Sequence, residues 1–354
     1  MTKTAVVLFN LGGPDRPEAV RPFLFNLFND PAIIGLPQPF RWLLAQLISR
    51  RRAPIARAIY DNLGGGSPLL PNTEAQAAAL EKALGEGGGA DTVKVFIAMR
   101  YWHPMSDATA RAVRDFGPDR VLLLPLYPQF STTTTGSSTK DWLRAARAAG
   151  LRAPTRVLCC YPRDSGFVAE SAALLAKALD EAASKASRTR VLFSAHGLPK
   201  KIVDGGDPYQ WQVEQSTAAV VAALGERAQR LDWLVCYQSR VGPLEWIGPA
   251  TEDEIRRAGE EGVGVVLVPI AFVSEHSETL VELDIEYREL AEEAAVPFYI
   301  RVPTVGAGAS FVAGLAGLVC RALADKDAAT APVEGSPLCP AAFGRCACRA
   351  AAGS

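Results

Sequence analysis

Residues 190–199 read Arg190-Val-Leu-Phe-Ser-Ala-His196-Gly-Leu-Pro199. A short apolar run that ends in Gly and Pro predicts a buried strand followed by a tight loop, which here carries a histidine. Seven further runs of this kind are Ala5–Phe9, Val93–Met99, Val121–Leu126, Arg156–Cys160, Trp233–Tyr237, Val263–Ile270 and Phe298–Val302. Most stretches between them place apolar residues three and four positions apart, as a helix face does. The alternation predicts an α/β fold with parallel sheets and helices on both faces.

A weak internal repeat divides the chain into two similar halves. In the first half, one strand runs into His103 and a later strand carries Pro125. The second half repeats this order with His196 and Pro269. We therefore expect two Rossmann-like halves with a boundary near residue 155. The expected parts are a first half, 1–155, a second half, 156–325, and a cysteine-bearing C-terminal extension, 326–354.

The composition excludes several classes of protein. The chain has 354 residues, is 49% apolar and carries a net charge of -1, so it lacks the basic footprint of a nucleic-acid-binding protein. No apolar run reaches the roughly 18 residues of a spanning helix, and the first run lacks the features of a signal peptide. We expect a cytoplasmic protein without disulfides. Cys236 and Cys320 lie in apolar runs and are expected in the core.

A histidine and a row of carboxylates follow the strand at Val263–Ile270. His276 precedes Glu278, Glu282 and Glu286, whose spacing of four predicts one face of an α-helix. Such a row is either a solvated acidic stripe near a helix N-terminus or a functional group of ligands. Imidazole and carboxylate together suit transient binding of Fe(II) and the acceptance of protons. Open α/β sheets bind ligands beyond the carboxyl ends of their strands, so all three histidines are expected at a functional edge.

Two segments of the first half have both a structural and a functional interpretation. Gly64-Gly-Gly-Ser67-Pro68 lacks the lysine of a P-loop, so nucleotide binding is not expected. Arg50-Arg51-Arg52 is either a solvated helix end or a clamp for carboxylates. The apolar stretch 33–48 precedes these arginines and is either a buried core helix or a surface that contacts an anionic membrane.

The C-terminal extension holds three cysteines within ten residues, Cys339, Cys346 and Cys348. Three thiols at this spacing suit zinc or an iron–sulfur cluster, and both require four ligands. The adjacent pair Cys159-Cys160, at the end of a predicted strand, can supply the fourth ligand. The sequence leaves open which of the two does so.

Taken together, the motifs resemble those of ferrochelatases. The similarity runs in order from about Val6 to Leu323. It rests on Leu11-Gly-Gly-Pro14, Arg51-Arg-Ala-Pro54, Gly64-Gly-Gly-Ser-Pro68, Met99-Arg-Tyr-Trp-His-Pro104, Tyr127-Pro-Gln-Phe-Ser131, Thr134-Thr-Gly-Ser-Ser138, Ser194-Ala-His-Gly-Leu-Pro199, Gln238-Ser-Arg-Val-Gly-Pro-Leu-Glu-Trp246 and Glu275-His-Ser-Glu-Thr-Leu-Val-Glu-Leu-Asp-Ile-Glu-Tyr287. One such motif carries little information, but their ordered sum over some 300 residues is very specific.

The resemblance implies two Rossmann-like halves around a porphyrin cleft and insertion of Fe(II) into protoporphyrin IX. It implies that His196 is the central catalytic histidine, that Glu278 is its partner across the ring and that both contact the iron. It implies that His276 and the acidic helix face conduct protons or metal. The positions that match pocket-lining or propionate-binding residues are Leu11, Arg51, Tyr60, Ser67, Arg100, Tyr101 and Trp246. The stretch 33–48 matches a lip by which many members contact the membrane, which makes the expected location cytoplasmic with peripheral contact to the inner membrane.

The cysteines resemble those of bacterial members that carry a [2Fe–2S] cluster. Animal members have a cluster cysteine where this chain has Thr132, so the resemblance implies ligands from Cys339, Cys346, Cys348 and one of Cys159 and Cys160. A related chelatase that uses coproporphyrin, or another tetrapyrrole and metal, is an alternative, as is a non-enzymatic haem or metal carrier of the same fold. Both a monomer and a homodimer fit the composition.

Overall fold

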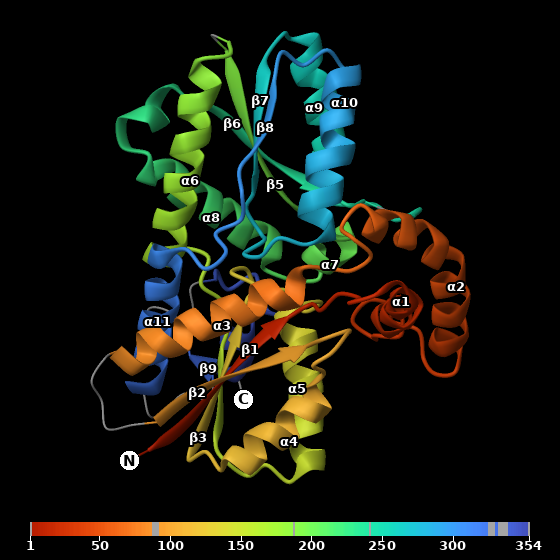
Figure 1. The fold of residues 1–354 in the computed structure, drawn as a ribbon, viewed down its shortest axis with the longest axis vertical. Coiled ribbons are helices and arrows are strands. Elements are labelled where there is room, and N and C mark those ends of the chain that lie inside the picture. Colours follow the sequence, from red (N-terminus) through yellow and green to blue (C-terminus); the bar gives the residue numbers. More distant parts are fainter. Residues whose placement is uncertain are drawn as a thin grey trace. The chain divides into compact units, whose positions relative to one another are not determined.

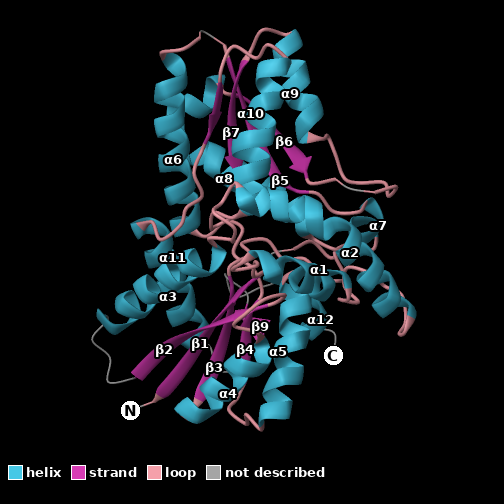
Figure 2. Ribbon diagram, turned by 45° about the vertical axis from the view of Figure 1, so that its right-hand side comes forward, coloured by secondary structure: helices cyan, strands magenta, loops and turns pink. Residues whose placement is uncertain are grey.

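The computed structural model describes residues 2–86, 92–186, 188–240, 242–324, 330–331 and 339–352. Parallel strands form two sheets flanked by helices, as predicted (Figures 1 and 2). The chain divides into two compact units. Unit 1 comprises Met1–Cys160, Leu315–Leu338 and Cys346–Ser354, and unit 2 comprises Tyr161–Gly314 and Cys339–Arg345. Of the expected extension 326–354, the residues other than 330–331 and 339–352 lie outside the described part of the chain.

Unit 1 contains a sheet with the strand order β2-β1-β3-β4-β9. Its strands are β1 (Lys3–Asn10), β2 (Thr92–Met99), β3 (Arg120–Pro125), β4 (Thr155–Leu158) and β9 (Thr330–Ala331). Its helices are α1 (Val20–Phe28), α2 (Phe40–Asp61), α3 (Leu69–Glu86), α4 (Ser106–Phe116), α5 (Thr135–Ala149) and α12 (Ala347–Ala352), with a 3-10 turn at Pro17–Ala19. The helix α11 (Ala309–Ala324) passes from unit 2 into unit 1. Phe9 and Trp142 pack in a buried core on one face of the sheet.

Unit 2 contains a sheet with the strand order β6-β5-β7-β8. Its strands are β5 (Thr189–His196), β6 (Asp232–Gln238), β7 (Gly264–Pro269) and β8 (Tyr299–Arg301). Its helices are α6 (Ser165–Ala183), α7 (Lys200–Asp204), α8 (Tyr209–Ala223), α9 (Thr251–Glu260) and α10 (Tyr287–Glu293), with a 3-10 segment at Gly225–Arg230 and a π-helix at Glu278–Glu286. Strands β5 and β7 are buried almost throughout, which explains why the sequence of each is a nearly continuous apolar run.

The two sheets share one topology, because β1 lies between β2 and β3 as β5 lies between β6 and β7. Strands β3 and β7 correspond, and each ends in a proline, Pro125 and Pro269. The prediction that the strand before His103 corresponds to the strand before His196 is wrong by one strand in the sheet order. His103 follows the edge strand β2, whereas His196 ends the central strand β5, whose counterpart is β1.

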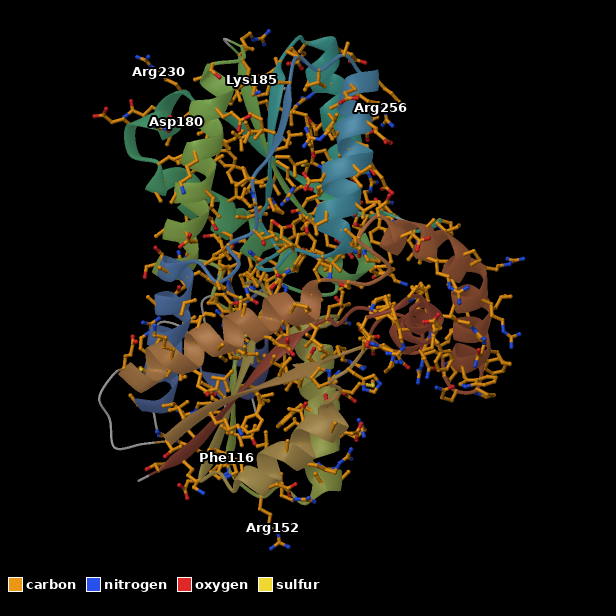
Figure 3. All side chains as sticks on the ribbon, in the orientation of Figure 1. Phe116, Arg152, Asp180, Lys185, Arg230 and Arg256 are labelled. Atoms are coloured by element: carbon orange, nitrogen blue, oxygen red, sulfur yellow. The ribbon has the colours of Figure 1, made fainter. Side chains whose placement is uncertain are left out.

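The carboxyl ends of the strands carry the candidate site residues, and the amino ends carry ordinary surface residues. In unit 1, Phe116 marks the amino end, where the Lys3 ammonium lies 5.5 Å from the centre of its ring (Figure 3). Arg152, in the loop before β4, projects there into solvent. In unit 2, the corresponding edge carries Asp180 (Figure 3). Its carboxylate forms a surface ion pair with Arg227 at 2.8 Å. Exposed pairs of this kind add little stability.

Three local predictions need correction. The stretch 33–48 is helical only from Phe40 onward, after Pro37 and Pro39. Cys236 is buried as predicted, but Cys320 is exposed, because it lies on the outer side of α11. The α-helix predicted from the spacing of Glu278, Glu282 and Glu286 is instead a π-helix over these residues, and the chain becomes α-helical only at Tyr287.

Candidate functional site

The acidic and imidazole groups of unit 2 meet at the carboxyl edge of its sheet. His196 is the last residue of the central strand β5. His276 lies in the loop that follows the neighbouring strand β7, and Glu278 is the first residue of the π-helix. The topology therefore brings together three side chains that lie up to 82 positions apart in the sequence (196 to 278).

Glu278 lies between the two imidazoles. Its Oε1 is 3.9 Å from His196 Nε2, and its Oε2 is 3.6 Å from His276 Nε2. Each histidine places Nδ1 against a backbone carbonyl, that of Gly197 at 2.6 Å and that of Ser274 at 3.1 Å. A carbonyl oxygen only accepts, so Nδ1 of each ring donates a proton. Each Nε2 therefore faces the carboxylate: with its proton it donates toward Glu278, and without that proton its lone pair can bind a metal.

The two imidazoles keep Glu278 ionised. Burial opposes its negative charge, but the positive charge of the protonated His196, the hydrogen bond from His276 and the charge of protonated His276 outweigh burial and lower the pKa of Glu278 from 4.5 to about 2. An ionised carboxylate with two flanking nitrogens is a ligand set that suits Fe(II). The pair His196–Glu278 is too close for a macrocycle to lie between its members, because atoms on opposite faces of a ring must be at least ~7 Å apart. In this conformation, both groups therefore address the same face of any bound ring.

A second carboxylate, Glu282, is fixed by four donors. Its Oε2 accepts from Ser239 Oγ at 2.6 Å and from Gln238 Nε2 at 3.1 Å. Its Oε1 accepts from the Ser239 backbone N–H at 2.9 Å and from Tyr287 Oη at 3.2 Å. Burial and the neighbouring Glu278 charge raise the pKa of Glu282 above its usual value. Ser239 reaches Glu282 with a positive φ of 58°, a conformation that costs a non-glycine residue about 1 kcal/mol.

The π-helix changes the expected acidic stripe. Glu278 and Glu282 both reach the site, but Glu286 is exposed. The prediction of one face for all three assumed the α-helical repeat, whereas the wider hydrogen-bonded turn of a π-helix shifts each later residue around the axis. Short π-helical segments are rare and are frequently found at functional sites.

In unit 1, Arg100 and Tyr101 are held by Asp30, which is 3% exposed. Arg100 Nη2 lies 2.9 Å from Asp30 Oδ2, and Tyr101 Oη donates to the same oxygen at 2.7 Å. Ser137 Oγ donates to it as well, and accepts from Arg100 Nε at 2.7 Å. Burial and the Asp30 charge raise the pKa of Tyr101 well above its usual value. Tyr101 is thus a buried support for this network.

The remaining unit 1 residues fall into two groups. Leu11 and Tyr60 pack in one apolar cluster with Tyr101 and Trp102, and the Leu11 carbonyl accepts from the Tyr101 N–H at 2.9 Å. Ser67 lies in the glycine loop, and its backbone N–H donates to the Pro14 carbonyl at 2.7 Å. A side chain at Gly66 would meet the Asp15 carbonyl at 2.7 Å, so only glycine permits this approach.

Arg51, Trp246 and His103 are not members of these clusters. Arg51 is exposed on α2. The Trp246 ring lies in unit 2 against Gly197, where an added Cβ would meet it at 3.2 Å, so Trp246 is placed directly beside His196. His103 stacks edge-on against Trp102 with ring centres 5.0 Å apart, and no metal-ligating group within the described ranges gathers around it.

Cys159, Cys346 and Cys348 form a buried triad in unit 1, with their sulfur atoms all within 4.8 Å of one another. Hydrogen bonds with neighbouring thiols raise the pKa of Cys159, Cys160 making the largest contribution, and those of Cys159 and Cys346 raise the pKa of Cys348. Crowded buried thiols stay protonated unless a cation stabilises the thiolates, so the donor set fits a metal or cluster. Cys339 is placed in unit 2, where its sulfur lies 3.0 Å from Gln212 Nε2.

Sequence patterns did not single out Asp30, Gln238 or Ser239. Asp30 reaches its partners across about 70 and 107 positions, and nothing in its local sequence marks it. Gln238 and Ser239 stand in the motif 238–246, which carries the family resemblance but predicts no role for either residue. No helix in the described part of the chain is long and apolar enough to span a membrane.

Replacing Glu278 tests its ionisation through the stability of the protein. The folded-state pKa of about 2 lies below the unfolded value near 4.5, so the ionised carboxylate stabilises the fold above pH 4.5, and this contribution is lost as the pH falls toward 2. The difference in unfolding free energy between wild type and Glu278→Gln should shrink over that window by up to about 1.4 kcal/mol per pH unit. Urea titrations at stepped pH measure it. Glu286→Gln should change in the opposite sense, since partial desolvation of this largely exposed carboxyl and the nearby Glu289 charge raise the pKa of Glu286. Equal curves for both variants would refute the assignment.

Comparison with known proteins identifies the family. The family model named ferrochelatase matches residues 3–323. The chain is 58% identical over 347 residues to the ferrochelatase of Phenylobacterium zucineum (strain HLK1), covering 98% of each chain, and 55% identical over 347 residues to that of Caulobacter vibrioides (strain NA1000 / CB15N), again covering 98% of each. The solved structure of SirB from Bacillus subtilis with Fe3+ shares the fold, with a TM-score of 0.50 and 10% identity over 91% of this chain and 96% of that one. The chain belongs to the ferrochelatase family of porphyrin-metallating enzymes.

Proposed function

We propose that this protein inserts Fe(II) into protoporphyrin IX, with release of the two pyrrole protons, to give protohaem. The observation that carries the proposal is the Glu278 carboxylate shared between the Nε2 atoms of His196 and His276. This centre provides an anionic ligand and two imidazole lone pairs at one place, which are the groups that metal delivery and proton removal both require.

The reaction at this centre is an exchange of equal charge. His196 and Glu278 hold the incoming Fe(II) through a nitrogen and an oxygen. As the iron moves onto the pyrrole nitrogens, two N–H bonds break, and each imidazole Nε2 accepts one proton. One Fe2+ leaves and two H+ arrive, so the charge of the centre is the same before and after. The Glu278 carboxylate stabilises the resulting imidazolium ions, because it remains ionised well below neutral pH.

Bending of the porphyrin assists this exchange. A flat ring shields its inner nitrogens, whereas a saddled ring tilts the N–H groups toward one face. Binding energy from the periphery of the ring can supply that distortion. Trp246, which packs beside His196, is suited to contact the periphery through its ring.

Removing the central imidazole should abolish turnover. His196→Ala deletes a ligand and a proton acceptor, so the rate of porphyrin metallation should fall by at least about 100-fold, while the circular dichroism spectrum stays unchanged. The absorbance of protoporphyrin IX with Fe(II) or Zn(II) follows the reaction over many equivalents, which separates an enzyme from a stoichiometric carrier. The control is Glu286→Gln, at an exposed position of the π-helix that carries Glu278, and this variant should retain activity. Near-normal turnover by His196→Ala would contradict the proposed role.

We propose further that the cysteines hold a [2Fe–2S] cluster. The triad of Cys159, Cys346 and Cys348 supports three ligands, and the spacing of the C-terminal extension supports Cys339 as the fourth. A cluster there would supply a structural or redox-sensing centre, and no step of metal insertion uses it. Cys159 rather than its neighbour Cys160 contributes to the triad.

Two cysteine variants, one inside the triad and one outside it, test the cluster. Wild-type protein purified without oxygen should be brown and contain two irons and two acid-labile sulfides per chain, as a [2Fe–2S] cluster requires. Cys348→Ser should remove the visible absorbance and the sulfide, because it removes a thiolate ligand. Cys320→Ser, at an exposed cysteine outside the triad, should keep both. Bound zinc without sulfide in the wild type would overturn the cluster assignment.

We propose a peripheral membrane contact through the segment 33–48 and the arginines that follow it. Helix α2 buries small residues at four-residue spacing, Ala45, Ser49 and Ala53, and turns its large apolar residues outward. Seven large apolar side chains of this region are exposed: Ile33, Leu36, Phe40, Trp42, Leu43, Leu47 and Ile55. Contiguous exposed apolar side chains next to exposed arginines are typical of a surface that lies on anionic lipid.

Vesicle binding tests this contact. Leu43→Ser combined with Leu47→Ser should weaken sedimentation with vesicles of phosphatidylcholine and phosphatidylglycerol by about 10-fold, because both side chains lose their transfer into the lipid. Leu143→Ser, at an exposed leucine of α5, is the control and should bind like the wild type. Equal binding by all three proteins would rule out the segment as a membrane contact.

A further inference from the structure

Arg301 is a buried cation next to the acidic centre of unit 2. It is the last residue of the short strand β8, and its side chain is 9% exposed. Its Nη1 lies 2.8 and 3.1 Å from the two carboxylate oxygens of Glu275. Its Nη2 lies 2.7 Å from Asp284 Oδ2. One guanidinium therefore joins two carboxylates that belong to different segments of the chain.

These two carboxylates bracket the catalytic segment. Glu275 directly precedes His276 in the loop after β7 and also accepts from the Thr304 N–H at 2.9 Å. Asp284 lies within the π-helix, two residues after Glu282. Arg301 thus fixes the chain on both sides of Glu278, although it does not touch Glu278 itself.

The π-helix gives a physical reason for such a clamp. A π-helical turn is less favourable than an α-helical one, so contacts outside the helix must hold it in place. A shift toward α-helical hydrogen bonding would rotate the residues after Glu278 relative to those before it. A guanidinium has a planar, rigid fork of donors, which fixes the direction of both carboxylates as well as their distance.

A neighbouring arginine offers a comparison within the same elements. Arg288, on α10, lies 3.6 Å from Asp284 Oδ1, but its side chain is 44% exposed. It also donates to the Tyr299 carbonyl at 3.2 Å. Solvent screens an exposed pair of this kind, and among the described residues Arg288 forms no ion pair with Glu275. The clamp across Glu278 therefore depends on Arg301.

We propose that Arg301 is a positioning residue for porphyrin metallation: by joining Glu275 to Asp284, it holds Glu278 and His276 where metal and protons exchange. The inference rests on the proposed function and adds a residue that no sequence motif marked. It acts on the placement of the metal-exchanging groups and leaves the binding of the porphyrin periphery unchanged.

Arg301→Lys and Arg301→Met test the inference against Arg288→Met as the matched control. A lysine keeps the charge, but its single ammonium cannot grip both carboxylates as a guanidinium does. Both Arg301 variants should lower kcat with Zn(II) and protoporphyrin IX by about 10- to 100-fold, as displacement of catalytic groups by about 1 Å does. They should also raise the KM for Zn(II), with a change in porphyrin KM below about threefold. Arg288→Met should remain within about threefold of the wild type in all three constants.

A purely structural role gives a different pattern. It predicts that kcat follows thermal stability, so Arg301→Lys with a near-normal Tm would then be near-normal in kcat; that result overturns the inference. Porphyrin fluorescence quenching counts binding-competent sites, so kcat is expressed per site. If Arg301→Met does not fold, Arg301→Lys and Asp284→Asn, which each keep part of the clamp, take its place and should show the same split between kcat and porphyrin KM.

Failure of the proposed function has its own signature. In that case the wild type itself would not metallate porphyrin. Isothermal titration with Zn(II) alone then decides the inference, because the cysteines are identical in wild type and Arg301→Lys and cancel in the comparison. Weaker Zn(II) binding by Arg301→Lys supports the clamp, and superimposable isotherms overturn it.

Discussion

The carboxylate of Glu278, ionised between two imidazoles, is the interaction on which the functional arrangement of unit 2 depends. Burial alone would favour its neutral form, and only the two neighbouring nitrogens reverse that preference. Each histidine can play this part because a backbone carbonyl fixes its Nδ1 as a donor. Strand β5 supplies one ring and the loop after β7 supplies the other, so the pairing of neighbouring parallel strands creates the centre. Ligand sites at the carboxyl edge of such sheets arise in the same way.

Much of this arrangement could be predicted from the sequence, since it follows from patterns of short range. Apolar runs revealed the strands, and the residues directly after them revealed the edge where His196 and His276 lie. The π-helix could not be found, because a spacing of four fits an α-helix equally well until the hydrogen bonds are known. Asp30 and Arg301 could not be found either. Each is a single charged residue whose meaning comes from partners distant in sequence, Tyr101 for one and Glu275 for the other.

The same limit applied to the internal repeat and to the cysteines. Motif order suggested matching the strand before His103 with β5, but only the pairing of strands shows that β5 corresponds to β1. Strand β4 ends at Leu158, so Cys159 and Cys160 follow it in a loop, and the alternation of side chains along a strand could not choose between them. The triad includes Cys159. Side-chain direction, unlike strand location, is set by register and packing.

The acidic residues around the site form two groups, those that pair with an arginine and those that do not. Glu275 and Asp284 share Arg301, so their charges are neutralised within the protein and serve to hold the chain. Glu278 and Glu282 have no arginine or lysine partner among the described residues, and only histidines, hydroxyls and amides surround them. A carboxylate already paired with a guanidinium binds a passing metal weakly, because the two cations compete for it. The separation of arginine-paired from arginine-free carboxylates along one short segment is therefore what turns an acidic stripe into a site that can accept Fe(II) and exchange it for protons.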